Sequence, residues 1–478
     1  MSNPDPKGKP RKSSAASQPV DLVARAITKL QSLAPRSDAQ KAKGQLEVER
    51  SNQCLLSEIR YVFKADNRSF DDLAGGFPVG RVCEVYGLEA CGKTALMIRT
   101  AVKAQIGNVY EVVRTPSDTT YRKLDPSEYE VMVGYFDNEQ SLDDDSKIVV
   151  DGVALNVALG RADTVDLLFK GVEGLIKVVA ERQAELVEKR SKKIVFGLIV
   201  VDTIAATSSA QEMSMEWGKE DYARQPQQIS RGFRKIVRMV NRNNICLICT
   251  NQVRDKIGEA TNQKGRPKSP IPQSVEYTTF GGKALRFYAS YRVFMYALPT
   301  KYRLVPKTQF QVGLLIGFYT VKNRIRMPLR EGRMVLLFDE QQGGLNDTFS
   351  MLESLLLLRF AEMENKEEGT DIRFKFSRAG VVPTTFDKTR ASTTLAEDDE
   401  KPVARRSKPK DPSIRIRADW PAFYAEHKSD FDALWAAALR YAFSSEGLSE
   451  NAVVHADDND GDNGENDPDP EPESDSQD

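Results

Sequence analysis

One octapeptide constrains the fold of this chain more than any other feature. Residues 87–94 read Gly-Leu-Glu-Ala-Cys-Gly-Lys-Thr and fit the pattern G-x-x-x-x-G-K-[ST]. An apolar, β-rich run precedes them at residues 81–86, and a helical pattern follows at residues 95–105. In this context the backbone N–H groups of such a loop wrap a phosphate at the start of a helix. We therefore predict a phosphate site on a strand–loop–helix unit.

The side chains of this loop indicate a nucleoside triphosphate with a metal ion. Lys93 supplies a cation to the β- and γ-phosphates, and the Thr94 hydroxyl is a ligand for Mg²⁺. We expect ATP and Mg²⁺ as the bound groups. The predicted nucleotide contacts in the loop are Gly87, Leu88, Glu89, Ala90, Cys91, Gly92, Lys93 and Thr94.

Two further apolar runs end in carboxylates. Residues 195–201 are followed by Asp202, and residues 131–136 are followed by Asp137 and Glu139. Since adjacent parallel strands bring their C-terminal ends to one crevice, we expect Asp202 to bind Mg²⁺ with Thr94, although buried strands also end in aspartate caps. Glu139 or Asp137 could orient the water that attacks the γ-phosphate, and an ordinary surface turn is the alternative for both.

Strand and helix patterns alternate along the middle of the chain. Apolar runs at residues 81–86, 131–136, 195–201 and 245–250 are separated by helical patterns such as residues 166–190. This order predicts an α/β fold with a mainly parallel sheet flanked by helices. Runs at residues 288–296, 314–321 and 334–338 lack long intervening helices, so antiparallel hairpins should complete the sheet.

The composition changes along the chain and predicts its organisation. We expect a disordered basic tail at residues 1–18, an amphipathic helix and arm at 19–50, an α/β core at 51–345, a small α+β C-terminal domain at 346–450 and a disordered acidic tail at 451–478. A basic linker at residues 391–417 interrupts the C-terminal domain. Residues 455–478 carry 11 acidic and no basic side chains, so the rest of the chain has a net charge of +10.

Several classes of chemistry are excluded. The two histidines, His427 and His455, lie near the C-terminus, so a histidine-based centre cannot form in the first four hundred residues. Cys246 and Cys249 fall in an apolar run and indicate core packing rather than redox or zinc chemistry. No apolar stretch reaches the length of a membrane span, and the polar start lacks a signal-peptide core, so we expect a cytoplasmic protein.

Six spaced segments together resemble one known family. They are residues 77–81, 135–143, 200–206, 250–258, 278–290 and 321–325. In this order they are similar to the RecA family of DNA recombinases, over roughly residues 20 to 345. The resemblance implies a RecA-like ATPase core, with an N-terminal helix arm that docks on an adjacent subunit.

The resemblance assigns roles at the nucleotide. Glu139 matches the acid that activates the attacking water, which decides between it and Asp137. Asp143 matches an adenine contact, and Gln252 matches the glutamine that senses the γ-phosphate.

The resemblance also implies self-assembly. Lys322 and Arg324 match paired cations that one subunit inserts into the ATP site of its neighbour, with arginine replacing a lysine at position 324. Phe287 matches an interface residue. The nucleotide would then lie between subunits, and ATP would favour a filament.

DNA contact in this family comes from two loops, which here fall near residues 216–223 and 254–279. Basic side chains in a Gly- and Pro-rich segment suit phosphate contacts, and an ordinary solvated loop is the alternative. The candidates are Arg254, Lys256, Lys264, Arg266 and Lys268 in the second loop, with Arg286 and Arg292 in the segment that follows. The basic linker is either a solubilising segment or a duplex-DNA patch. The acidic tail resembles a regulatory tail that competes with DNA.

The sequence thus predicts an ATP-dependent DNA recombinase that forms filaments on single-stranded DNA, pairs it with homologous duplex and exchanges strands. Its partners would be single- and double-stranded DNA, further copies of itself, and mediator or single-strand-binding proteins, without a membrane. A hexameric helicase or translocase on the same core and a non-hydrolysing nucleotide-binding regulator are the alternatives.

Overall fold

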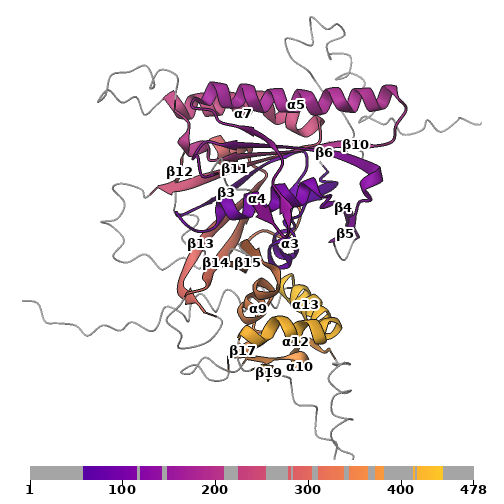
Figure 1. Cartoon of the computed structure of the whole chain (residues 1–478), viewed down its shortest axis with the longest axis vertical. Coiled ribbons are helices and arrows are strands. Elements are labelled where there is room, and N and C mark those ends of the chain that lie inside the picture. The colour runs from indigo at the N-terminus through magenta and orange to yellow at the C-terminus, as the bar shows by residue number, and fades with distance from the viewer. Residues whose placement is uncertain are drawn as a thin grey trace, which may run out of the picture. The chain divides into compact units, whose positions relative to one another are not determined.

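The computed structural model describes most of the central chain (Figure 1). The described residues are 58–115, 119–142, 148–208, 224–254, 278–280, 284–303, 311–338, 344–363, 372–381, 413–414 and 417–444. By its contacts the chain divides into two units, Met1–Glu58 and Ile59–Asp478, and the account below concerns the second. The predicted N-terminal helix, both tails and the linker at 391–417 lie largely or wholly outside the described residues.

A large mixed sheet forms the centre of this unit. Its strand order is β16-β15-β14-β13-β3-β11-β10-β6-β9, with β12 paired to β11. The strands are β3 (Arg81–Gly87), β6 (Tyr129–Asp137), β9 (Ala158–Gly160), β10 (Ile194–Asp202), β11 (Ile245–Arg254), β12 (Thr278–Thr279), β13 (Tyr291–Tyr302), β14 (Gly313–Lys322), β15 (Glu331–Leu337) and β16 (Gly344–Asn346).

The direction of the strands changes once across this order. From β9 to β13 along the main path every neighbouring pair is parallel, and from β13 to β16 every pair is antiparallel. The predicted α/β fold with a mainly parallel sheet and antiparallel hairpins is therefore confirmed. The alternation of strand and helix dictates the parallel half, because a parallel pair needs a long crossover connection.

Helices cover both faces of the sheet (Figure 1). One face packs on α5 (Val165–Glu188) and α7 (Arg224–Arg242), which bury Leu168, Ile176 and Phe233 with one set of strand side chains. The other face packs on α4 (Lys93–Gln105), which buries Leu96 and Met97. Strands covered on both faces must be apolar throughout, which is why β10 is a continuous run of buried residues after Ile194.

A second sheet was not predicted. It has the order β2-β1-β4-β5 and comprises β1 (Tyr61–Phe63), β2 (Phe77–Pro78), β4 (Val109–Arg114) and β5 (Thr119–Lys123). The β4–β5 hairpin follows α4 and precedes the short η2 turn (Pro126–Glu128). Its side chains are half-exposed and partly charged, so its sequence carries a weak hydrophobic signal.

The C-terminal elements pack on the core through specific polar contacts. They are α9 (Asp347–Leu357), β17 (Ala361–Met363), β18 (Ile372–Phe374), α10 (Phe376–Ala379), β19 (Ser413–Ile414), η5 (Arg417–Asp419), α12 (Trp420–Glu426) and α13 (Lys428–Ala442). Arg68, on α3 (Arg68–Ala74), donates hydrogen bonds to Tyr424 Oη at 2.8 Å and to Asp432 Oδ1 at 2.6 Å. The indole of Trp435 donates to Asp72 Oδ2 at 2.9 Å.

One local prediction needs correction. The segment expected as a strand at 288–296 begins as the helix α8 (Ala284–Tyr288), and β13 starts only at Tyr291. In the C-terminal part, α9 ends at Leu357 and the short strand β17 follows at Ala361. Short elements such as α10, β7 (Val149–Val150), β8 (Val153–Ala154) and η3 (Ile204–Ala206) carry too few residues for a periodic signal. None of the described helices is long and apolar enough to span a membrane.

Replacing the buried Trp420 by alanine tests the packing of the C-terminal elements. Trp420 is fully buried, its ring lies 4.8 Å from that of Phe431, and its indole N–H donates to Thr348 O at 2.7 Å. We expect Trp420→Ala to lower the free energy of unfolding by about 3–5 kcal/mol, measured by urea unfolding. Phe338→Ala, at a side chain that is 52% exposed, is the control and should change little. Equal unfolding midpoints for both variants would contradict the packing described.

Candidate nucleotide site

The phosphate loop joins β3 to α4 as the sequence predicts. Ala90 and Gly92 adopt positive φ angles of 53° and 79°, which turn the chain so that α4 begins at Lys93. The first turn of α4 contains no acidic residue, and no side chain caps its N-terminus. Its N–H groups and its dipole therefore favour an anion at this point.

Glycine is required at the first position of the loop. A Cβ atom on Gly87 would lie 1.9 Å from Met295 O on the neighbouring strand β13. At Gly92 a Cβ atom would lie 2.5 Å from Cδ1 of Ile316. Strand packing thus holds the loop backbone against the sheet, while Leu88, Glu89 and Ala90 are exposed.

The side chain of Lys93, at the start of α4, lies over the phosphate loop. Its ammonium group donates to Leu88 O at 2.6 Å and to Gly87 O at 3.2 Å. The side chain is therefore folded toward the centre of the loop, where it can reach a phosphate bound by the same backbone. Cys91 is buried and its thiol donates to Leu88 O, so it acts as a packing residue of the loop.

The carboxyl ends of four strands meet at one edge of the sheet. The register aligns Gly87 of β3 with Gln252 of β11, and Asp202 of β10 with Asp137 of β6. Because neighbouring strands are about 4.8 Å apart, their terminal side chains form one polar row beside the phosphate loop. The predicted convergence of these residues is observed in the structure.

Asp202 is buried at this edge with a carboxylate held by two donors. Tyr135 Oη donates to Oδ2 at 2.8 Å, and Thr250 Oγ1 donates to Oδ1 at 2.5 Å. A fixed carboxylate oxygen together with the Thr94 hydroxyl provides the oxygen ligands that Mg²⁺ prefers. The donor set therefore fits the metal ion that the loop motif implies.

Asp137 and Glu139 have different surroundings. Asp137 is buried and accepts hydrogen bonds from Ser141 N at 3.0 Å and Leu142 N at 3.0 Å, so its oxygens organise the following turn. Glu139 is exposed and accepts a hydrogen bond from Gln252 Nε2 at 3.0 Å. Glu139 is therefore the more accessible of the two carboxylates, and its role at a nucleotide stays a prediction.

The electrostatic surroundings of Glu139 favour the protonated form of its carboxyl group. Although Glu139 keeps exposed surface, the neighbouring atoms remove part of the water around its carboxylate, and this desolvation raises its pKa. The nearby charge of Asp202 raises the pKa further, while Lys93 and the hydrogen bond from Gln252 lower it. A carboxylate with a raised pKa is a better proton acceptor at neutral pH than a free one. Glu139 and Gln252 also line a cavity of about 540 Å³ with Asn138, Thr203, Ala205, Ala206 and Phe280.

A cluster of cations lies at the opposite edge of the sheet. Lys322 ends β14, Arg324 follows it and is exposed, and Arg81 begins β3. Burial and the charge of Arg324 lower the pKa of Arg81, and burial, Arg324 and Arg292 lower the pKa of Lys322. Arg81 lies at the start of β3, about 20 Å of strand before Gly87, whereas Lys322 is aligned through Arg292 with Glu84, about 10 Å along the strand before Gly87.

The predicted DNA contact of Arg292 is wrong. It is 6% exposed, and its guanidinium forms an ion pair through Nε with Oε2 of the fully buried Glu84. The guanidinium also lies 4.6 Å from the ring centre of Tyr86. A side chain enclosed in this way cannot contact a DNA backbone, so Arg292 belongs to the interior.

Other predicted residues are placed only in part. Asp143, Lys256, Lys264, Arg266 and Lys268 lie outside the described residues, and only the backbone of Arg254 is described. Arg286 lies on α8 and stays a prediction. Phe287, on the same helix, is 76% exposed, and its role at an interface stays a prediction. Cys246 and Cys249 are buried in β11, in agreement with core packing.

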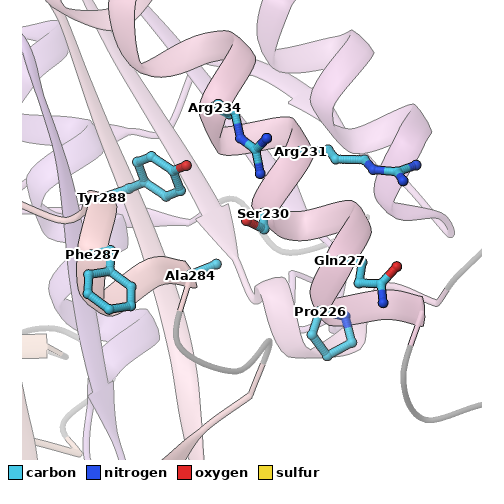
Figure 2. Close-up of a pocket in the computed structure, with 8 residues that line it drawn as sticks. All are labelled: Pro226, Gln227, Ser230, Arg231, Arg234, Ala284, Phe287 and Tyr288. Carbon is cyan, nitrogen blue, oxygen red and sulfur yellow. The ribbon is translucent and has the colours of Figure 1, made fainter.

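One group of functional candidates was missed in the sequence. A cavity of about 700 Å³ between α7 and α8 is lined by Pro226, Gln227, Ser230, Arg231, Arg234, Ala284, Phe287 and Tyr288. Figure 2 shows Ser230 and Arg234 on α7 across from Tyr288 on α8. The helix α7 begins directly after the first segment expected to contact DNA, and α8 begins five residues after the second. The signal was the spacing of Arg231, Arg234 and Arg238 at three and four residues, which lies along one side of a helix.

Fold and loop together place a P-loop sequence motif on a mainly parallel α/β sheet. Residues 177–343 match the RecA N-terminal domain. Protein RecA of Sulfurovum sp. (strain NBC37-1) is 28% identical over 266 residues, which are 56% of this chain and 62% of that relative. Protein RecA of Streptomyces rimosus is 30% identical over 278 residues, 57% of this chain and 59% of the relative.

The predicted resemblance to the RecA family is therefore confirmed, and the chain contains a RecA-like domain. For Protein RecA of Colwellia psychrerythraea (strain 34H / ATCC BAA-681) the identity is 26% over 292 residues, 60% of this chain and 68% of the relative. The chain spans less than two thirds of the length of the Sulfurovum and Streptomyces relatives.

Removing the loop lysine tests the nucleotide site. Lys93→Ala deletes the cation over the loop and should weaken ATP binding roughly 10- to 100-fold, the usual range for losing a hydrogen bond to a charged group. Binding of a fluorescent ATP analogue with Mg²⁺ measures this. Lys170→Ala, at an exposed lysine of α5, is the matched control and should bind as the unmodified protein does. Equal affinity for Lys93→Ala would refute the assigned site.

Proposed function

We propose that this protein is a DNA-dependent ATPase that assembles into filaments on single-stranded DNA and acts as a recombinase. The observation that carries this proposal is the division of the nucleotide site between two edges of one sheet. The phosphate loop, Asp202, Glu139 and Gln252 gather at the carboxyl edge, and Lys322 and Arg324 lie at the amino edge. One copy cannot bring both sets to the same nucleotide.

A second copy completes the site in this proposal. Head-to-tail stacking puts the amino edge of one copy over the carboxyl edge of the next, so that Lys322 and Arg324 reach the β- and γ-phosphates held by the neighbour's loop. An interface of this kind joins two different surfaces, and it generates an open helix whenever the rotation does not close. Phe287, which is exposed on α8, packs within the same contact.

Hydrolysis follows from the groups at the carboxyl edge. The loop backbone and Lys93 hold the phosphates of ATP, and Mg²⁺, when bound by Thr94 and Asp202, neutralises charge that develops on them. Glu139 accepts a proton from the attacking water, and its raised pKa suits this task near neutral pH. Gln252 hydrogen-bonds Glu139 and lies near the end of β11, just before the second predicted DNA loop, so it can respond to the γ-phosphate.

DNA binds in this proposal along α7, α8 and the two segments that precede them. Arg231, Arg234 and Ser230 contact backbone phosphates with Arg286, and the loop cations Arg254, Lys256, Lys264, Arg266 and Lys268 add further contacts. Such contacts do not depend on base sequence and should weaken steeply with salt. A recombinase needs this property, because it must accept any single strand before pairing it with homologous duplex.

The Glu139 carboxylate distinguishes an ATPase from a nucleotide-binding regulator. Glu139→Gln keeps the shape and the hydrogen bond to Gln252 but cannot accept a proton, so phosphate release with single-stranded DNA should fall about 100- to 10,000-fold while ATP binding persists. Glu181→Gln, at an exposed glutamate of α5, is the control. An unchanged rate in Glu139→Gln would favour the regulator.

A mixing experiment tests the shared site. Lys93→Ala lacks its own phosphate cation, and Arg324→Ala lacks the cation given to a neighbour, so each variant alone should be nearly inactive. In an equal mixture about a quarter of the contacts join an intact loop to an intact Arg324, and activity should return to about that fraction. Activity that stays at the level of the single variants contradicts the shared site.

Assembly and strand exchange complete the test of function. With ATP and single-stranded DNA, electron microscopy should show open helical filaments, whereas closed rings would favour a hexameric translocase. A strand-exchange assay with ATP and with a slowly hydrolysed analogue then tests recombinase activity directly. If no strand-exchange product forms with either nucleotide, the proposed recombinase activity is refuted.

A further inference from the structure

Three charged side chains form a row across neighbouring strands. The register pairs Arg292 of β13 with Glu84 of β3 on one side and with Lys322 of β14 on the other. Register partners point to the same face of a sheet, and neighbouring strands are about 4.8 Å apart. The Cα atoms of Glu84 and Lys322 are therefore about 10 Å apart. An extended lysine side chain can cover most of that distance.

Arg292 and Asn251 occupy both oxygens of the Glu84 carboxylate. Arg292 Nε donates to Oε2, and Asn251 Nδ2 donates to Oε1 at 3.1 Å. Glu84 has no exposed surface, and the side chain of Arg292 is 8% exposed. A carboxylate buried to this degree must be paired, because an unpaired buried charge costs several kcal/mol.

Lys322 bonds to backbone carbonyls rather than to that carboxylate. Its ammonium group donates to Ala289 O at 2.6 Å and to Arg286 O at 3.4 Å, at the end of α8. Arg292 and Arg324 are both close enough to act on its charge, and so is Glu84, which attracts it. The position of the Lys322 ammonium group therefore depends on which cation neutralises Glu84.

We propose that Arg292 is a positioning residue: by pairing with Glu84 it prevents that buried carboxylate from capturing Lys322, and it leaves the lysine at the surface that meets the next copy. This inference rests on the proposed function, in which Lys322 completes the neighbour's ATP site. Arg292 itself touches neither nucleotide nor DNA.

Loss of Arg292 then also removes the Lys322 ammonium group from the surface. In Arg292→Met the buried Glu84 lacks its partner, and the flexible ammonium of Lys322, on the next strand, turns inward to replace it. The surface loses its lysine although residue 322 is unchanged. Arg292→Met should therefore behave as Lys322→Ala does, with single-copy nucleotide binding intact and cooperative ATPase reduced.

A double-mutant cycle measures this dependence. We expect Lys322→Ala and Arg292→Met each to raise the half-saturating ATP concentration for DNA-stimulated ATPase roughly tenfold, the lower range for a lost charged hydrogen bond. If Arg292 acts through Lys322, the combined variant should be no worse than Lys322→Ala. If the half-saturating ATP concentration of the combined variant rises by the product of the two single effects, Arg292 acts elsewhere and the proposal is overturned.

Rescue by a second substitution separates positioning from general stability. Glu84→Met combined with Arg292→Met removes the carboxylate that captures Lys322 and leaves two apolar side chains of suitable length, a replacement that buried ion pairs tolerate. Cooperative ATPase should return, and adding Lys322→Ala should abolish it again. A double variant that folds and binds an ATP analogue but stays non-cooperative would refute the inference.

The same series separates this inference from the proposed function. Arg122→Met, at an exposed arginine paired with Glu111, is the control and should leave every value unchanged. If Lys322→Ala alone has no effect, the shared nucleotide site fails. If Lys322→Ala is impaired and Arg292→Met is not, only the positioning role fails.

Discussion

The direction of the strands is the constraint on which the rest of the structure depends. Parallel strands from β6 to β3 carry Asp137, Asp202, Gln252 and Gly87 to one edge, since each connection must cross the sheet before the next strand begins. The antiparallel strand β14 runs the other way and brings Lys322 to the opposite edge. In the proposed assembly, a second copy supplies Lys322 to the nucleotide held at the carboxyl edge.

A buried ion pair between two strands carries a large desolvation cost in free energy. Apolar residues of similar size often stabilise a fold as well or better, because two charges lose their water. The pair Glu84–Arg292 is therefore poor support for stability as such. Its value lies in specificity, because it fixes which of two neighbouring cations faces inward. Asn251 extends the same arrangement, as its amide also donates to Phe280 O and accepts from Gln252 N.

Much of the core could be predicted from the sequence, because its signals are local. The strand before the phosphate loop, the helix after it and the carboxylates at strand ends each leave a pattern within about ten residues. The β4–β5 hairpin was missed because its half-exposed strands mix Thr, Tyr, Arg and Glu, which resembles a loop. Arg292 was assigned to DNA because a sequence shows its charge and hides its partner. Glu84, a carboxylate inside an apolar strand, was the sign that a buried cation must lie across from it. Phe287, Lys322 and Arg324 depended on resemblance alone, since the role of a surface residue in assembly has no local pattern.

The close approach of Gly87 to Met295 O has a mechanical meaning. The phosphate loop rests on β13 with no side chain between them, and three residues further back the same strand carries Arg292. A rigid strand transmits a displacement along its length. A movement of the loop on phosphate binding would therefore also displace the guanidinium of Arg292 on β13. In the proposed filament, β13 would therefore be the direct structural link between the phosphate loop of a copy and the Glu84–Arg292 pair that positions its Lys322.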